Sequence, residues 1–147
     1  MIAHRVMAGP VSRLESVLGL LAGSLGREHA SSLHMARALS QSTLSDDSRA
    51  EVMTMHHLGL MAIASEDPLR ASFLFEKAAE QSSFSNKTRL TNLVAAGISR
   101  HLVGEDEVAK SLISGASKIV AKDKESAIDP LLDLARSLTV SYTHLRA

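Results

Sequence analysis

The seven histidines are the residues of this chain that could most readily do chemistry, as metal ligands or as proton carriers. His56 and His57 are adjacent and would point about 100° apart on a helix, while His29 and His34 are five residues apart. Neither spacing suits two ligands of one ion. The chain also has no cysteine, no H-E-x-x-H motif and no aspartate-rich loop. We therefore expect no metal site and no cofactor.

Arrangements that support catalysis are missing from the sequence as well. Serine, histidine and aspartate are present, but there is no G-x-S-x-G motif, no P-loop and no G-x-G-x-x-G loop. The acidic residues Glu105, Asp106 and Glu107 are explained by a helix start, where the helix dipole favours negative charge. We predict that the chain has no catalytic residues and is not an enzyme. This prediction does not extend to a part that could follow it in a longer protein.

Apolar residues recur at helical spacing, and no stretch of useful length alternates with the period of two that is typical of strands. Pro10 is predicted to open a first helix, which carries Val11, Leu14, Val17, Leu18 and Leu21 and ends near Ser24. Gly26 breaks this pattern, and a second helix is predicted from about Arg27. The whole chain is therefore predicted to be all-helical.

Capping signals predict where the later helices begin. Ser48 and Glu51 have the spacing of a capping box, with Ser45 as a rival cap for the same helix. Asp67 is predicted to cap the next helix, whose first residue would be Pro68. Further helices are predicted to begin at Ser85, at the hinge of Gly104 and the acidic residues, and at Asp129-Pro130.

Residues 56–82 predict two short helices joined by a hinge, and their internal spacing recurs along the chain. The recurring positions are Leu58-Gly59, Ala71, Phe75 and Ala78; upstream Leu18-Gly19, Ser31, Met35 and Ala38; downstream Ala96-Gly97, Ala109, Ile113 and Ala116; and finally Leu134-Ala135. The start-to-start intervals are 40, 38 and 38 residues. This pattern resembles the L-G…A-x3-F signature of tetratricopeptide-type helix pairs, whose usual period is about 34 residues. The runs LGLMA and FEKAAEQ are also similar to the related Sel-like repeats.

The resemblance implies a right-handed α-solenoid of antiparallel helix pairs, with about three and a half tetratricopeptide-like repeats and seven helices. One domain would cover residues 1–139, with repeats at about 10–44, 45–84 and 85–124 and a partial repeat at 125–139. Residues 140–147, VSYTHLRA, resemble a translated reading frame of a transposase-type sequencing adapter. We predict that they are a non-native tail on a truncated chain. The alternative is a natural C-terminus.

The resemblance also implies a site, because the first helices of successive pairs line the concave face of such arrays. Carried onto this chain, it selects Arg13, Ser16, Leu20, Met53, His56, Leu60, Ile63, Thr91, Val94, Ile98 and His101. This lining is apolar with two histidines, and it offers only Arg13 to a peptide carboxylate, so it favours an amphipathic helix or a hydrophobic peptide. The alternative is that Leu60, Ile63, Val94 and Ile98 are interhelical core.

Composition limits the partners that we expect. The 147 residues include 16 basic and 16 acidic residues and only 3% aromatic residues, so a nucleic-acid partner is disfavoured. No apolar run approaches the ~20 residues that span a bilayer, and residues 1–10 make a poor signal peptide. We expect no membrane partner and a cytoplasmic location.

These observations favour a non-catalytic protein-interaction scaffold that binds a peptide or helix in an apolar concave groove. It would be a truncated piece of a longer protein. The alternative is a structural or oligomerisation module of a larger regulator or enzyme, whose apolar face docks on its own chain or on a copy of itself.

Overall fold

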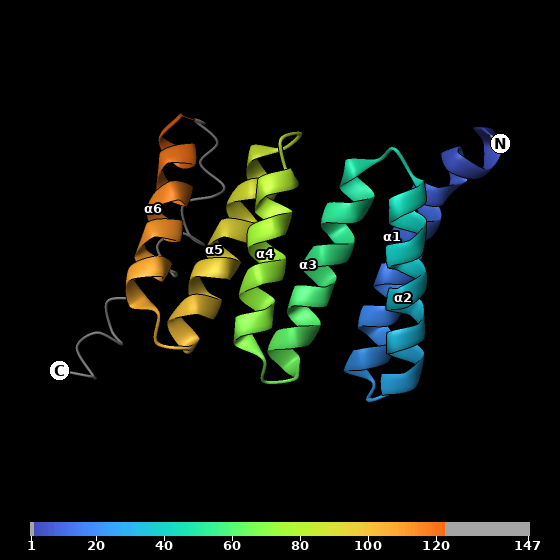
Figure 1. Cartoon of the computed structure of the whole chain (residues 1–147), viewed down its shortest axis with the longest axis horizontal. Helices are drawn as coiled ribbons and strands as arrows, with labels where there is room; N and C mark the ends of the chain where they lie inside the picture. Colours follow the sequence, from blue (N-terminus) through green and yellow to red (C-terminus); the bar gives the residue numbers. More distant parts are fainter. Residues whose placement is uncertain (1, 123–147) are drawn as a thin grey trace.

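The computed structural model describes residues 2–122, and this part of the chain is all-helical, as predicted (Figure 1). Its helices are α1 (Ile2–Ser24), α2 (Glu28–Leu44), α3 (Ser48–Ala64), α4 (Pro68–Gln81), α5 (Asn86–Leu102) and α6 (Asp106–Lys122). The seventh helix predicted from Pro130 and the tail predicted at 140–147 lie outside the described residues. None of the described helices is long and apolar enough to cross a membrane.

Successive helices lie side by side and run in opposite directions, joined by short turns (Figure 1). Helix α1 packs on α2, α3 on α4, and α5 on α6, and we refer to these as the three pairs. Contacts of α3 with α1 and α2, and of α4 with α5, join one pair to the next. Each helix is therefore packed mainly against its neighbours along the chain.

Within each pair, one glycine of the first helix allows the second helix to approach closely. The glycine and the side chain that covers it are Gly19 and Met35, Gly59 and Phe75, and Gly97 and Ile113. A Cβ atom added at Gly59 would lie only 2.6 Å from Cε1 of Phe75, so no larger residue fits without a shift. The covering side chains are in turn almost fully buried, since Phe75 is 1% exposed. The L-G and A-x3-F positions of the sequence thus meet each other across each helix pair.

The turn inside each pair has the same backbone conformation. Its left-handed residue is Gly26 (φ 70°) after α1, Glu66 (φ 58°) after α3 and Gly104 (φ 82°) after α5. The residue that follows donates its N–H to a carbonyl five residues back, as Asp67 does to Ala62 at 2.9 Å. This arrangement is a Schellman motif, which satisfies carbonyl groups at the end of a helix. The helix break predicted at Gly26 and the hinges predicted at Glu66-Asp67-Pro68 and at Gly104 are confirmed.

Two predicted caps are confirmed, and a third was wrong. Asp67 accepts a hydrogen bond from the N–H of Arg70 at 3.1 Å, and Ser85 caps α5 in the same way. For α3, however, the cap is Asp47, and the predicted cap Ser48 is the first residue of the helix. The carboxylate of Asp47 accepts from the N–H of Arg49 at 3.0 Å and carries the negative charge that the helix dipole favours. The rival cap Ser45 instead follows the end of α2.

The predicted start of the first helix was also wrong, because α1 begins at Ile2 and contains Pro10 in its interior. Proline has no N–H, so the carbonyl of Val6 loses its usual helical partner. The segment before Pro10 is rich in good helix formers, including Met7 and Ala8. Their preference for helix explains why α1 continues through the proline and does not start there.

Candidate binding cavity between the first helices of the pairs

A cavity of about 390 Å³ lies between α1, α3 and α5, and we call it the basic cavity. It is lined by Arg13, Arg49, Val52, Met53, His56, Phe84, Lys87, Thr88, Thr91 and Asn92. Its apolar surface comes from Val52, Met53 and Phe84, and Phe84 also packs against the buried cluster around Val52. The cavity thus combines apolar walls with several positively charged side chains.

Charge is distributed unevenly around the basic cavity. The described residues that line it include Arg13, Arg49, Lys87 and His56 but no aspartate or glutamate. The positive charge of Arg13 is neutralised by Asp47, which does not line the cavity: Nη1 of Arg13 lies 2.6 Å from Oδ2 of Asp47. Neither Arg49 nor Lys87 pairs with a carboxylate in the part of the chain that the structure describes. The cavity therefore carries positive charge although the whole chain is neutral.

The positions of Arg49 and Lys87 increase this positive potential. Both lie in the first turn of a helix, Arg49 in α3 and Lys87 in α5. A helix N-terminus carries a partial positive charge, so a basic side chain there is unfavourable for the helix itself. Arg49 is held over the ring of Phe84, with Cζ 5.5 Å from the ring centre. A basic residue therefore destabilises the first turn of both α3 and α5, and residues that lower local stability in this way are typical of functional sites.

Two histidines of α3 fix the walls between the pairs. The Nδ1 atom of His56 donates to Oδ1 of Asn92 at 2.9 Å, and Asn92 in turn donates to the carbonyl of Thr88. His57 lies 3.0 Å from Oγ of Ser16, whose own proton goes to the carbonyl of Arg13. Burial lowers the pKa of the His57 imidazole below its ordinary value, the adjacent His56 lowers it further, and the hydrogen bond with Ser16 opposes both.

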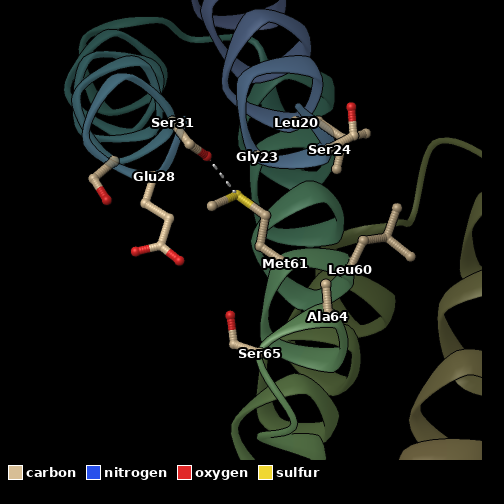
Figure 2. Close-up of a pocket in the computed structure, with 10 residues that line it drawn as sticks. Leu20, Gly23, Ser24, Glu28, Ser31, Leu60, Met61, Ala64 and Ser65 are labelled. Carbon is tan, nitrogen blue, oxygen red and sulfur yellow. Dashed lines mark hydrogen bonds between the residues drawn. The ribbon is translucent and has the colours of Figure 1, made fainter. Parts of the chain in front are cut away.

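A second cavity of about 430 Å³ lies between α1, α2 and α3, and we call it the serine cavity (Figure 2). Leu20 and Leu60 line it together with Ser24, Ser31, Ser65 and other residues. Figure 2 shows Ser31 pointing toward Met61, and its hydroxyl lies 3.6 Å from the sulfur atom. The serine cavity has one ionisable lining residue among those described, Glu28, so it lacks the charge that distinguishes the basic cavity.

The structure divides the predicted site residues into three groups. Arg13, Met53, His56 and Thr91 line the basic cavity, and Leu20 and Leu60 line the serine cavity. The others line neither of these two cavities: Ser16 is buried beside His57, Ile63 packs on the cluster around Phe75, Val94 and Ile98 belong to the cluster around Leu90, and His101 bonds to Asp106. For Ile63, Val94 and Ile98 the geometry matches the interhelical-core alternative. The predicted residues are therefore distributed over two cavities and the packed interior.

Sequence reasoning missed several residues of the basic cavity, above all Arg49 and Lys87. The sequence intervals that make Arg13, Met53 and Thr91 equivalent also make Arg49 equivalent to Lys87. These two residues lie four positions, or about one helical turn, before Met53 and Thr91. If the residues predicted to line the concave face had included one more turn toward the N-terminus of each helix, Arg49 and Lys87 would have been among them.

A metal site finds no support in the described residues. In residues 2–122, no group of three or more histidine, aspartate or glutamate side chains is arranged to hold a metal ion. Comparison of the chain with protein-family models, with curated proteins and with solved structures finds no match. The candidate site consequently rests on the geometry of the basic cavity alone.

Proposed function

We propose that this chain is a non-catalytic binding scaffold whose basic cavity takes an apolar side chain from an acidic segment of a protein partner. The observation that carries the proposal is the unpaired positive charge of Arg49 and Lys87 beside the apolar surface of Met53 and Phe84. A leucine-like side chain would fill the apolar part, while flanking carboxylates would meet the basic side chains.

The proposed architecture is a right-handed α-solenoid of tetratricopeptide-like pairs. Three features recur at the same sequence intervals in the described part of the chain, and they support this architecture: the glycine contact within each pair, the left-handed turn and the buried small residues of the second helix. In such an array each pair is stabilised mainly by its neighbours. The first helices then lie beside each other, and a partner can contact several of them at once.

The cavity is suited to binding more than to catalysis. His56 is already engaged by Asn92, and Arg13 by Asp47, so these two side chains are held in place and form fixed walls. Arg49 and Lys87 present positive charge without a carboxylate partner among the described residues. Fixed walls and unmatched charge favour recognition of a complementary surface, because no group has to be desolvated without a partner.

The proposal can be tested by fluorescence anisotropy with short labelled peptides. We expect the peptide Glu-Glu-Leu-Glu-Glu to bind, and its binding to weaken as salt is raised, because screening reduces attraction between exposed charges. Glu-Glu-Ser-Glu-Glu and Lys-Lys-Leu-Lys-Lys test the apolar side chain and the charge separately, and both should bind at least about tenfold more weakly. Equal binding of all three peptides would contradict the proposal.

Variants of the chain locate the binding site. Arg49→Glu combined with Lys87→Glu should abolish binding of the acidic peptide, whereas Lys77→Glu combined with Lys118→Glu makes the same charge change at exposed positions of α4 and α6. The control variant should bind like the wild type. If it loses binding equally, net charge and not the cavity determines the interaction. If a single-stranded oligonucleotide displaces the peptide at lower concentration than unlabelled peptide does, the cavity belongs to a nucleic-acid site and the proposal fails.

A further inference from the structure

The outer face of α1, together with the residue that follows its last turn, carries a stripe of apolar side chains, most of which are exposed. Its residues follow one another at intervals of four and three and are Met7, Val11, Leu14, Leu18, Leu21 and Leu25. Val11 is half-buried, and the other five side chains are between 38% and 71% exposed. Alternation of four and three residues is the spacing of the core positions of a coiled coil. We call this set the α1 stripe.

The opposite face of α1 packs against the rest of the chain with small residues. Gly9, Ser12, Ser16 and Gly19 are all buried there, and the hydroxyl of Ser12 donates to the carbonyl of Ala38 in α2 at 2.8 Å. Leu14, Leu18 and Leu21 are thus directed outward and these small residues inward, whereas Leu20 lines the serine cavity. Burial against α2 and α3 therefore does not explain the leucines of the stripe.

The α1 stripe corresponds to the face by which α3 and α5 pack on the preceding pair. By the sequence intervals, Leu14 is equivalent to Thr54 of α3 and to Asn92 of α5. Thr54 lies 3.3 Å from Ser12 of the preceding pair, and Asn92 accepts a hydrogen bond from His56 of the preceding pair. At the position of Leu14 these interfaces use polar residues, but Leu18 and Leu21 are equivalent to Leu58 and Met61 of α3, and Met61 lies 3.6 Å from the hydroxyl of Ser31 in the preceding pair. The stripe is therefore a more apolar version of a face that packs against another helical surface.

The charges around the stripe allow it to pair with itself. Between Met7 and Leu25 the charged residues are Arg13 and Glu15, and neither belongs to the stripe. Arg13 binds Asp47, and Glu15 lies 2.6 Å from Nδ1 of His34. The stripe itself contains no charged residue, so two stripes brought together across a two-fold axis would not place like charges directly opposite each other.

We propose that the α1 stripe is the interface of a homodimer, in which α1 of one chain packs against α1 of a second copy. Leucines at Leu14 and Leu21 occupy the same type of core position, one heptad apart, and would interlock with side chains of the facing helix. The basic cavity opens between α1, α3 and α5 and includes only Arg13 from α1, a residue outside the stripe. The dimer would carry two such cavities. Its formation does not depend on the proposed peptide binding.

Sedimentation equilibrium of the full 147-residue chain tests the dimer. From low to high micromolar concentration, we expect the mass to approach twice the 15.7 kDa of one chain. Leu14→Glu combined with Leu21→Glu should remain monomeric with an unchanged circular dichroism spectrum, because four carboxylates would meet at the interface. The milder variant Leu21→Ser should fold as the wild type does and raise the dimer dissociation constant at least about tenfold.

A matched control places two glutamates on other exposed apolar residues, with Leu69→Glu in α4 and Val108→Glu in α6, which are 42% and 43% exposed. This variant should dimerise like the wild type. A wild-type chain that stays monomeric at high micromolar concentration would overturn the proposal. Dimers that persist in Leu21→Ser with an unchanged dissociation constant, or that are lost equally in the control, would overturn it as well.

Discussion

Replacing Gly59 with alanine should destabilise the chain, although alanine is the better helix former. The new Cβ atom would lie 2.6, 2.8 and 2.9 Å from the Cε1, Cζ and Cδ1 atoms of Phe75. Phe75 is 1% exposed and packs in a cluster with Ala62, Ala71 and Ala96, so its ring has little room to move away. Helices α3 and α4 would therefore have to separate.

Two opposing effects set the size of this change. Alanine is favoured over glycine inside a helix by about 0.8–1.0 kcal/mol. Overpacking a well-packed core costs about 1–3 kcal/mol, and contact with three atoms of a confined ring places Gly59→Ala in the upper half of this range. We expect a net destabilisation of about 1–2 kcal/mol, and a larger one for Gly59→Leu.

Gly115 provides the matched control, because it lies inside α6 and a Cβ atom there would meet nothing within 4 Å. Only the helix preference then acts, and Gly115→Ala should stabilise the chain by about 0.5–1 kcal/mol. Urea unfolding followed by far-ultraviolet circular dichroism measures both changes. If Gly59→Ala stabilises the chain as Gly115→Ala does, the close contact with Phe75 does not exist in solution.

A double-mutant cycle tests whether Phe75 is the cause. Phe75→Leu removes part of the ring that the new methyl group would meet, so it should cost less in the Gly59→Ala background than in the wild type. We expect a coupling free energy of at least about 0.5 kcal/mol, as for residues in direct contact. Additive effects of the two substitutions would assign the destabilisation to some other neighbour.

Three further predictions concern single side chains. Glu66→Gly should raise the melting temperature, because Glu66 has a left-handed φ of 58°, which costs a residue with a side chain about 1–2 kcal/mol. An unchanged or lower melting temperature would argue against the left-handed turn after α3. Arg100→Lys should lower the free energy of unfolding by about 1–3 kcal/mol. Arg100 bonds to Glu76 at 2.8 Å and to Glu105 at 2.6 Å, and lysine lacks the planar guanidinium group that bridges both carboxylates. An effect no larger than that of an exposed Lys→Arg change would refute this role. Burial lowers the pKa of His57, so the unfolded chain binds its proton more readily, and stability is lost as the pH falls below about 6.5. Between pH 7.5 and about pH 5, the wild type should therefore lose more stability in urea titrations than His57→Gln does, and parallel losses would contradict the assignment.

Local signals in the sequence were sufficient for most helix boundaries. Asp67 and Ser85 cap their helices through hydrogen bonds to N–H groups three residues ahead, and Gly26 and Gly104 end theirs with a left-handed turn. These interactions span only a few residues, so they can be read from neighbouring positions in the sequence. The recurring spacing also placed Gly59 correctly against the second helix of its pair, because both helices belong to one short hairpin.

Where several neighbouring residues could cap the same helix, tertiary contacts determined which of them does so. Ser45, Asp47 and Ser48 are all plausible caps for α3, and the sequence pattern favoured Ser48. Asp47 takes this role in the folded chain, where it also pairs with Arg13 of α1 across 34 residues of sequence. A capping rule that considers four consecutive residues cannot take account of Arg13, because Arg13 is distant in the sequence.

The composition and spacing of the sequence determined that the chain forms amphipathic helices in pairs, but only the tertiary structure decided what each face meets. The apolar spacing of α1 predicted a helix, yet Leu14, Leu18 and Leu21 are exposed, while Ser12, Ser16 and Gly19 face the interior. Arg49 and Lys87 are separated by 38 residues and border one cavity because α3 and α5 both start there. Backbone hydrogen bonds within a helix connect residues four apart, whereas the packing of one helix on another depends on side chains from distant segments. For this reason the helices could be predicted from the sequence, and the basic cavity and the exposed α1 stripe could not.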